Sequence, residues 1–103
     1  MVILRINKKN FDLIASGLKK SEWRQYSKYN IALLFKDRGD GKKDGNNEIK
    51  QIKFINGYSS ESPEIIKDIE FIRLCKFSKD VDIPNDNFKA LKDQFAIEIK
   101  FAN

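Results

Sequence analysis

The apolar residues near the C-terminus of this chain show the two-residue spacing of a β-strand most clearly. Segment 95–101 alternates Phe, Ile, Ile and Phe with Ala, Glu and Lys, which is typical of a strand with one buried face. Strands are also predicted at 2–6, 21–27, 49–55 and 63–77, the last with a bulge that breaks its alternation. We therefore expect the 103 residues to form a single domain of the α+β class. Its architecture would be a small mixed β-barrel of about five strands with one main helix near the N-terminus.

That helix is predicted by four apolar residues at the i, i+3, i+4 and i+7 spacing: Phe11, Ile14, Ala15 and Leu18. Asn7 is the expected N-cap, and Gly17 is the expected terminator with a positive φ. Segment 29–36 fits a strand and a short helix, and we favour the helix. Segment 37–48 is rich in glycine and charge, which predicts a loop. Segment 81–91 contains Pro84 and predicts one short helical turn.

The residue counts exclude several kinds of chemistry. The chain has no histidine and one cysteine, Cys75, so internal disulfides, Ser-His and Cys-His dyads and most zinc sites are excluded. We expect no metal and no cofactor. No apolar run approaches the roughly 20 residues of a membrane helix, and the first residues lack the pattern of a secretory signal. The expected protein is cytoplasmic and free of membranes. Its net charge of +5 favours nucleic acid as a partner, and nothing indicates an oligomeric state.

Residues 17–24 carry the clearest functional pattern, G-x-K-x-x-E-x-R, at the end of the predicted helix. Glu22 and Arg24 are two residues apart on a strand, so their side chains should project from one face with Lys19 beside them. Such a cluster suits a phosphate, a base edge or a small polar substrate. Trp23 has the opposite parity and is predicted to pack in the core.

A strand, a helix with the residues Phe11-Asp12-Leu13-Ile14 and then this motif resemble the start of ASCH domains, members of the PUA-like superfamily. The segment Phe54-Ile55-Asn56-Gly57-Tyr58 is similar to the strand and turn of small phage and bacterial ASCH proteins. The resemblance implies a compact barrel with a cleft beside the motif and a function related to RNA.

Some ASCH proteins are enzymes, and one known activity is an amidohydrolase that deacylates N4-acetylcytidine with a lysine, a threonine and a glutamate. Carried onto this chain, the lysine falls at Lys19. The threonine position holds Glu22, which departs from the amidohydrolase pattern. The later glutamate falls best at Glu70, and next at Glu64. Ribonuclease activity has also been attributed to an ASCH protein.

Two main hypotheses follow. The first is a protein that binds RNA or a nucleotide-like ligand through five residues: Lys19, Glu22, Arg24, Tyr26 and Tyr58. The tyrosines would stack on unpaired bases. The alternative is a small enzyme acting on RNA or a modified nucleoside, with Lys19 and Glu22 as the proton-handling pair and Glu70 as a further candidate. A purely structural pairing of Arg24 with Glu22 and a role in binding another protein also remain open.

Overall fold

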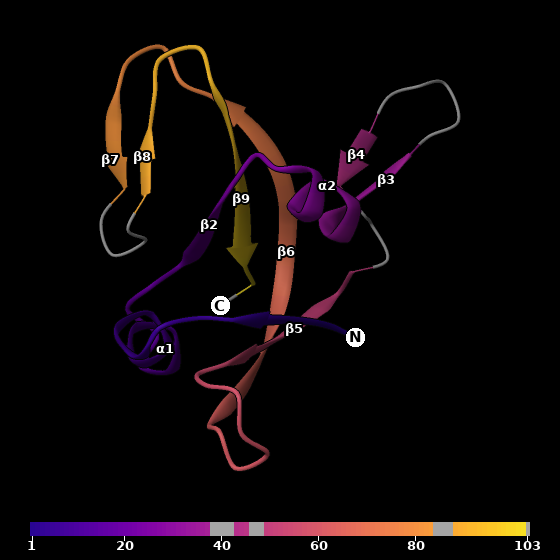
Figure 1. Ribbon diagram of the computed structural model, residues 1–103, viewed down its shortest axis with the longest axis vertical. Coiled ribbons are helices and arrows are strands. Elements are labelled where there is room, and N and C mark those ends of the chain that lie inside the picture. The colour runs from indigo at the N-terminus through magenta and orange to yellow at the C-terminus, as the bar shows by residue number, and fades with distance from the viewer. Residues whose placement is uncertain (38–42, 46–48, 84–87, 103) are drawn as a thin grey trace.

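A curled sheet of five strands forms the body of the protein. The computed structural model describes residues 1–37, 43–45, 49–83 and 88–102 (Figure 1). The strands lie in the order β1 (Val2–Arg5), β5 (Gln51–Ile55), β6 (Glu64–Lys76), β9 (Phe95–Phe101) and β2 (Ser21–Gln25). β1 and β5 are parallel, and the other neighbours are antiparallel. The sheet curls into a half-barrel, which confirms the expected small mixed α+β barrel of five strands.

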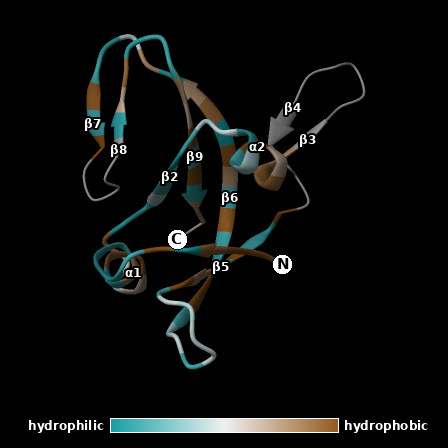
Figure 2. Cartoon of the chain, viewed as in Figure 1, coloured by the Kyte–Doolittle hydropathy of each residue, from teal (hydrophilic) through white to brown (hydrophobic). Residues whose placement is uncertain are grey.

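The long strand β6 carries the predicted bulge. Its register against β9 shifts between Ile69 and Phe71, where one extra residue bends the strand and increases the local twist. Figure 2 shows hydrophobic and hydrophilic bands along β6, and its residues alternate between exposed and at least half-buried from Glu64 to Glu70. This alternation is the pattern of a sheet with one face toward the core. The neighbouring strand β9 is buried more completely, because Ala96 and Glu98 on its outer face are buried as well as Ile97 and Ile99 on its inner face.

Two helices pack on the curled sheet. Helix α1 (Lys8–Ala15) begins where the side chain of Asn7 accepts a hydrogen bond from the backbone of Asn10, as the sequence predicts. Gly17 follows α1 with a φ of 80°, which confirms its role as terminator. Leu18 then lies outside the helix and is exposed, so it does not continue the apolar stripe. Helix α2 (Lys28–Leu34) confirms the helix favoured for 29–36.

The core lies on the concave face of the sheet and includes one or more residues from each helix. It consists of Leu4, Ile14, Ile31, Leu34, Phe35, Ile52, Phe54, Ile69, Ile97, Ile99 and Phe101. Neither helix is long and apolar enough to cross a membrane, among the residues that the structure describes.

Two local predictions are wrong. The described residues of segment 81–91 do not form a helical turn, because β7 (Val81–Ile83) pairs with β8 (Phe88–Ala90) as an antiparallel hairpin. Residues 84–87, which include Pro84, lie outside the described residues. Val81 and Ile83 are half-buried and the residue between them is exposed, which is the period of a strand. Segment 37–48 is not wholly a loop, since β4 (Lys43–Gly45) pairs with β3 (Phe35–Asp37). The rest of that segment, 38–42 and 46–48, lies outside the described residues.

Candidate nucleic-acid interface

The charged residues of the G-x-K-x-x-E-x-R motif point into the half-barrel. Glu22 lies opposite Ile99 of β9, and Arg24 lies opposite Ile97. Both isoleucines belong to the core, so the prediction that Glu22 and Arg24 share one face of β2 is confirmed. That face is the concave one, which places a carboxylate and a guanidinium at the border of the apolar core.

Trp23 occupies the other face of β2, and the prediction that it packs in the core is wrong. It lies opposite Glu98, is half-buried, and contacts the ring of Phe77 with a centroid distance of 5.7 Å. Trp23 does have the opposite parity to Glu22 and Arg24, but these two polar residues take the inner face of β2. Their mutual pairing makes this arrangement tolerable, because buried charges need partners.

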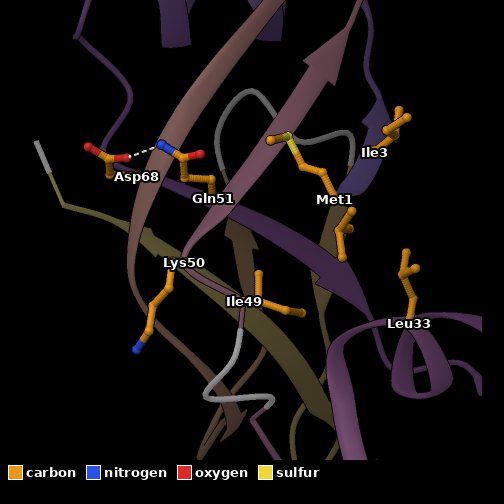
Figure 3. Close-up of a pocket in the computed structure, with 8 residues that line it drawn as sticks. Met1, Ile3, Leu33, Ile49, Lys50, Gln51 and Asp68 are labelled. Atoms are coloured by element: carbon orange, nitrogen blue, oxygen red, sulfur yellow. Dashed lines mark hydrogen bonds between the residues drawn. The ribbon is translucent and has the colours of Figure 1, made fainter.

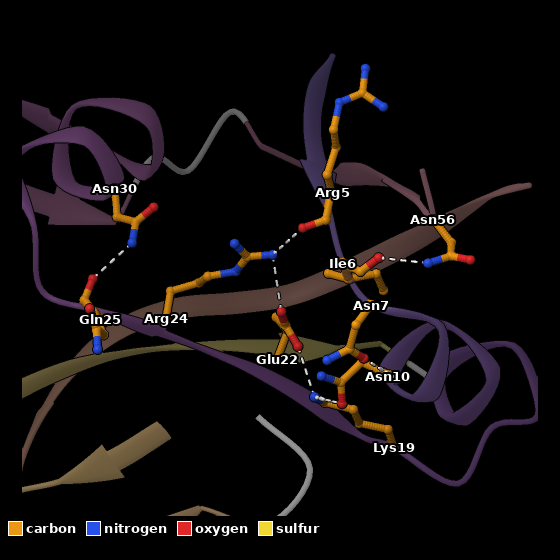
Figure 4. A network of polar contacts seen from close by, with 10 residues as sticks. All are labelled: Arg5, Ile6, Asn7, Asn10, Lys19, Glu22, Arg24, Gln25, Asn30 and Asn56. Atoms are coloured by element: carbon orange, nitrogen blue, oxygen red, sulfur yellow. Dashed lines mark hydrogen bonds and ion pairs between the residues drawn. The ribbon is translucent and has the colours of Figure 1, made fainter. Parts of the chain in front are cut away.

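Three charged side chains and one amide form a compact group, the motif cluster: Asn10, Lys19, Glu22 and Arg24 (Figure 4). The Oε1 of Glu22 lies 2.8 Å from the Nζ of Lys19, and its Oε2 lies 3.1 Å from the Nη2 of Arg24. Lys19 also donates to the Oδ1 of Asn10 at 3.0 Å. The side chains of Lys19 and Glu22 are 8% and 4% exposed, whereas that of Arg24 is 24% exposed. Arg24 is thus the charged member of the cluster most open to solvent.

Arg24 connects the two outer strands of the sheet. Its Nη2 donates to the carbonyl oxygen of Arg5 at 3.3 Å, and Arg5 is the last residue of β1. The Nε of Arg24 is buried and has no acceptor among the described residues. One carboxylate between two cations leaves the cluster with one net positive charge, so its electrostatics favour an anion at the solvent side of Arg24.

Tyr58 lies beyond β1, on the turn that follows β5. It is 87% exposed, and the guanidinium of Arg5 stacks over its ring at 4.9 Å from the centroid. Arg5 also donates to the carbonyl oxygen of Gly57. The Nδ2 of Asn56 donates to the carbonyl oxygen of Ile6 at 3.0 Å, which fixes the turn to the end of β1. These residues line a shallow pocket of about 360 Å³ together with Asn7.

The other predicted residues lie in different surroundings. Tyr26 follows the end of β2, is 56% exposed, and contacts the ring of Phe95 at 5.9 Å. Glu70 is exposed at the bulge of β6, unlike the buried Lys19 and Glu22. Glu64 is paired with Lys53 at 3.5 Å. The motif therefore brings Lys19, Glu22 and Arg24 together, and the tyrosines and the later glutamates stand apart from this group.

Two members of the site were missed by sequence reasoning. Arg5 falls in the strand predicted at 2–6, and its position directly after the buried Leu4 is the signal that its side chain faces solvent. Asn10 is an asparagine inside the predicted helix, three residues after the N-cap Asn7. Asparagine is unfavourable within helices, so its presence there indicated a side-chain role.

A second polar group, the outer cluster, lies on the convex face of the sheet and was also missed. Glu98 is 9% exposed, and its Oε1 accepts from the Nε of Arg73 at 2.7 Å, while its Oε2 accepts from Ser21 at 3.2 Å. The hydrogen bond and charge of Glu98 raise the pKa of Arg73. Cys75 lies 4.0 Å from the same carboxylate, and burial raises the pKa of its thiol.

A larger and mainly apolar pocket of about 730 Å³ lies at the start of β1 (Figure 3). Its apolar lining comes from Met1, Val2, Ile3, Leu33 and Ile49. Its polar rim includes Gln51, which donates to Asp68 at 2.9 Å. It shares no lining residue with the motif cluster, so the sequence motif and this pocket are separate features.

Comparison with known proteins gave no assignment. No family model, no curated protein and no solved structure matches this chain. The resemblance to ASCH domains therefore stays a prediction that these comparisons do not test.

Proposed function

We propose that the protein binds single-stranded RNA, or a nucleotide-like ligand, on the side of the half-barrel where Arg24 joins β2 to β1. The observation that carries this proposal is the environment of Arg24. Its contacts to Glu22 and to Arg5 both use Nη2, so the Nη1 donors remain for a ligand. A guanidinium held in this way is suited to a phosphate or to the edge of a base.

Lys19 and Glu22 act through Arg24 in this proposal. Both side chains are buried, so neither offers much surface to a polymer. Glu22 contacts the guanidinium of Arg24 on its buried side. Because Glu22 also pairs with Lys19, its one negative charge does not fully neutralise Arg24. The net positive charge left on the cluster attracts phosphate, in keeping with the +5 charge of the whole chain.

The exposed Tyr58 supports RNA rather than a simple anion as the ligand. Its ring lies beside the cationic group of Arg5, and Arg5 is linked through its carbonyl to Arg24. An aromatic face next to cations is a common way to hold an unpaired base and its phosphate, and single strands present such bases. Arg5 therefore joins Arg24, Tyr26 and Tyr58 in the proposed interface.

The test is fluorescence anisotropy of a labelled single-stranded RNA of ten nucleotides, measured at several salt concentrations. We expect affinity to fall as salt rises, and the Arg24→Lys variant to bind at least about fivefold more weakly, since one good contact is worth about 1 kcal/mol or more. The matched control is Arg73→Lys, because Arg73 also pairs with a buried glutamate but lies on the outer face. Equal affinity of both variants would contradict the proposal.

The contact of 2.8 Å between Lys19 and Glu22 favours one alternative function, an enzyme acting on RNA or on an acylated cytidine. In that function the two side chains would exchange a proton with the substrate. Turnover of N4-acetylcytidine or of RNA that disappears in Glu22→Gln would support the enzyme. Binding of RNA without any turnover would support the binding function and contradict the enzyme.

A further inference from the structure

A polar and aromatic pocket of about 570 Å³ lies between the end of β2, strand β8 and the start of β9. We call it the hairpin pocket, and its lining residues are Gln25, Tyr26, Lys89, Ala90, Leu91, Gln94 and Phe95. Its volume lies within the range of small-molecule sites, about 300–1,000 Å³. None of these residues belongs to the motif cluster, and only Tyr26 belongs to the predicted site.

Two exposed aromatic rings form one wall of the hairpin pocket. Tyr26 and Phe95 are 56% and 46% exposed, and their ring centroids lie 5.9 Å apart. Two exposed rings in contact offer a surface on which an unpaired base can stack. The Nζ of Lys76 lies 5.9 Å from the centroid of the Phe95 ring, so this aromatic wall has a cation at its edge.

The remaining lining supplies hydrogen-bonding groups. The side-chain amides of Gln25 and Gln94 make no hydrogen bond to other described residues, and both residues are exposed. An amide offers a donor pair and an acceptor, which matches the mixed donor and acceptor edge of a nucleobase. Lys89 adds an exposed ammonium that can meet a phosphate.

The turn that carries Gln94 is fixed in place. Asp93 has a φ of 65°, a left-handed conformation that few non-glycine residues adopt. Its backbone N–H donates to the carbonyl oxygen of Phe77 at 2.8 Å, and the N–H of Gln94 donates to Leu91 at 3.1 Å. The N–H of Lys92 donates to the carboxylate of Asp80 at 2.8 Å. Because three hydrogen bonds already fix the backbone of this turn, little backbone entropy is lost there when a ligand binds at Gln94.

From these observations we propose that the hairpin pocket holds one unpaired base of the bound strand, stacked on Tyr26 and Phe95 with its edge toward Gln25 and Gln94. This inference rests on the proposed function. It adds which part of the ligand each site binds: Arg24 binds the phosphate, and the hairpin pocket binds the base. Tyr26 directly follows β2, two residues after Arg24, so the Cα atoms of the two residues lie roughly 7 Å apart. One nucleotide can therefore place its phosphate at Arg24 and its base in the hairpin pocket.

The experiment pairs two probes on the same variants. The labelled ten-nucleotide RNA reports polymer binding by anisotropy, and the four nucleoside monophosphates are titrated while the side-chain amide signals of Gln25 and Gln94 are followed by NMR. We expect Tyr26→Ala and Phe95→Ala each to weaken RNA binding by at least about fivefold, since base stacking contributes about 1–3 kcal/mol. Tyr26→Phe keeps an aromatic face and should lose less affinity than Tyr26→Ala. The matched control Tyr29→Ala removes another exposed tyrosine and should have no effect.

The outcomes separate this inference from the proposed function. If Arg24→Lys weakens RNA binding and Tyr26→Ala does not, the hairpin pocket is not the base site and the inference is overturned. If the unchanged protein binds no RNA, the proposed function fails, and shifts of the glutamine amides by a monophosphate alone would still support a base site. Absence of both signals would overturn both proposals. Circular dichroism of each variant establishes that it is folded before its affinity is compared.

Discussion

The Nη2 atom of Arg24 lies 3.3 Å from the carbonyl oxygen of Arg5 and so joins the two outermost strands of the five-stranded sheet. Between β2 and β1 this side-chain contact takes the place of a backbone ladder. The same guanidinium is held by Glu22, whose other oxygen pairs with Lys19. The group proposed to meet the ligand is therefore also part of what holds the half-barrel together, and its removal should affect both properties.

Glu22→Ala should lower the free energy of unfolding by about 3–5 kcal/mol, because it leaves Lys19 and Arg24 near the core without their shared carboxylate. Urea denaturation followed by circular dichroism measures this change. The control is Glu61→Ala, which removes an exposed carboxylate and should change stability by less than about 0.5 kcal/mol. Similar losses for the two variants would mean that the motif cluster contributes little to the fold.

Lys19 and Glu22 should be energetically coupled. In Lys19→Met the Glu22 carboxylate keeps Arg24 as a partner, and in Glu22→Leu the two cations lose their common anion. Adding Lys19→Met to Glu22→Leu removes one of those cations, so the double variant should be more stable than the sum of the single losses predicts. We expect a coupling energy of about 1–3 kcal/mol in a double-mutant cycle of unfolding free energies. Simple additivity would show that the contact of 2.8 Å contributes nothing net.

Among the described residues, two glycines with positive φ, Gly17 and Gly57, offer a matched pair of substitutions. A Cβ at Gly57, whose φ is 122°, would lie 2.5 Å from the Oγ of Ser62, whereas nothing lies within 4 Å of a Cβ at Gly17. Gly17→Ala should therefore cost only the backbone strain, about 1 kcal/mol. Gly57→Ala should cost more, and it should also disturb the carbonyl that Arg5 contacts beside Tyr58. Thermal unfolding ranks the two variants, and a larger loss for Gly17→Ala would contradict this account.

Local sequence signals were sufficient for much of the fold. The N-cap Asn7, the terminator Gly17 and the bulge in 63–77 each depend on nearby residues, and each was predicted. The hairpin of β7 and β8 was not predicted, because a strand of three residues is too short to show a clear alternation of buried and exposed residues. Its stability comes from the pairing of the two strands with each other, which the pattern of either strand alone does not reveal.

Three charged residues of the candidate site could be predicted from the sequence, but their burial could not. The spacing of Glu22 and Arg24 placed them on one face, but the prediction turned Trp23 inward, whereas in the structure Glu22 and Arg24 face the core. That choice depends on β9, where Ile97 and Ile99 lie opposite them, and on Lys19 reaching Glu22 from the turn before the strand. The buried Glu98 was missed for the same reason: its partners Arg73 and Ser21 come from β6 and β2, far apart in the sequence.

Cys75 should lower the stability of the protein at alkaline pH. Burial raises the pKa of its thiol in the folded state above the value of about 8.5 for an unfolded chain. Below that unfolded value the thiol is protonated in both states, and its contribution to stability does not change with pH. Above it the unfolded chain releases the proton while the folded protein keeps it, so the free energy of unfolding falls until the pH passes the folded pKa.

The measurement compares the unfolding free energy of the unchanged protein with that of Cys75→Ala from pH 7 to pH 10. The stability of the unchanged protein relative to the variant should decrease above about pH 8.5. Alkylation by iodoacetamide gives an independent readout, since only the thiolate reacts. Its rate should rise with pH at a higher midpoint in the folded protein than in urea. If the two midpoints coincide, the surroundings of Cys75 beside Glu98 do not suppress its ionisation.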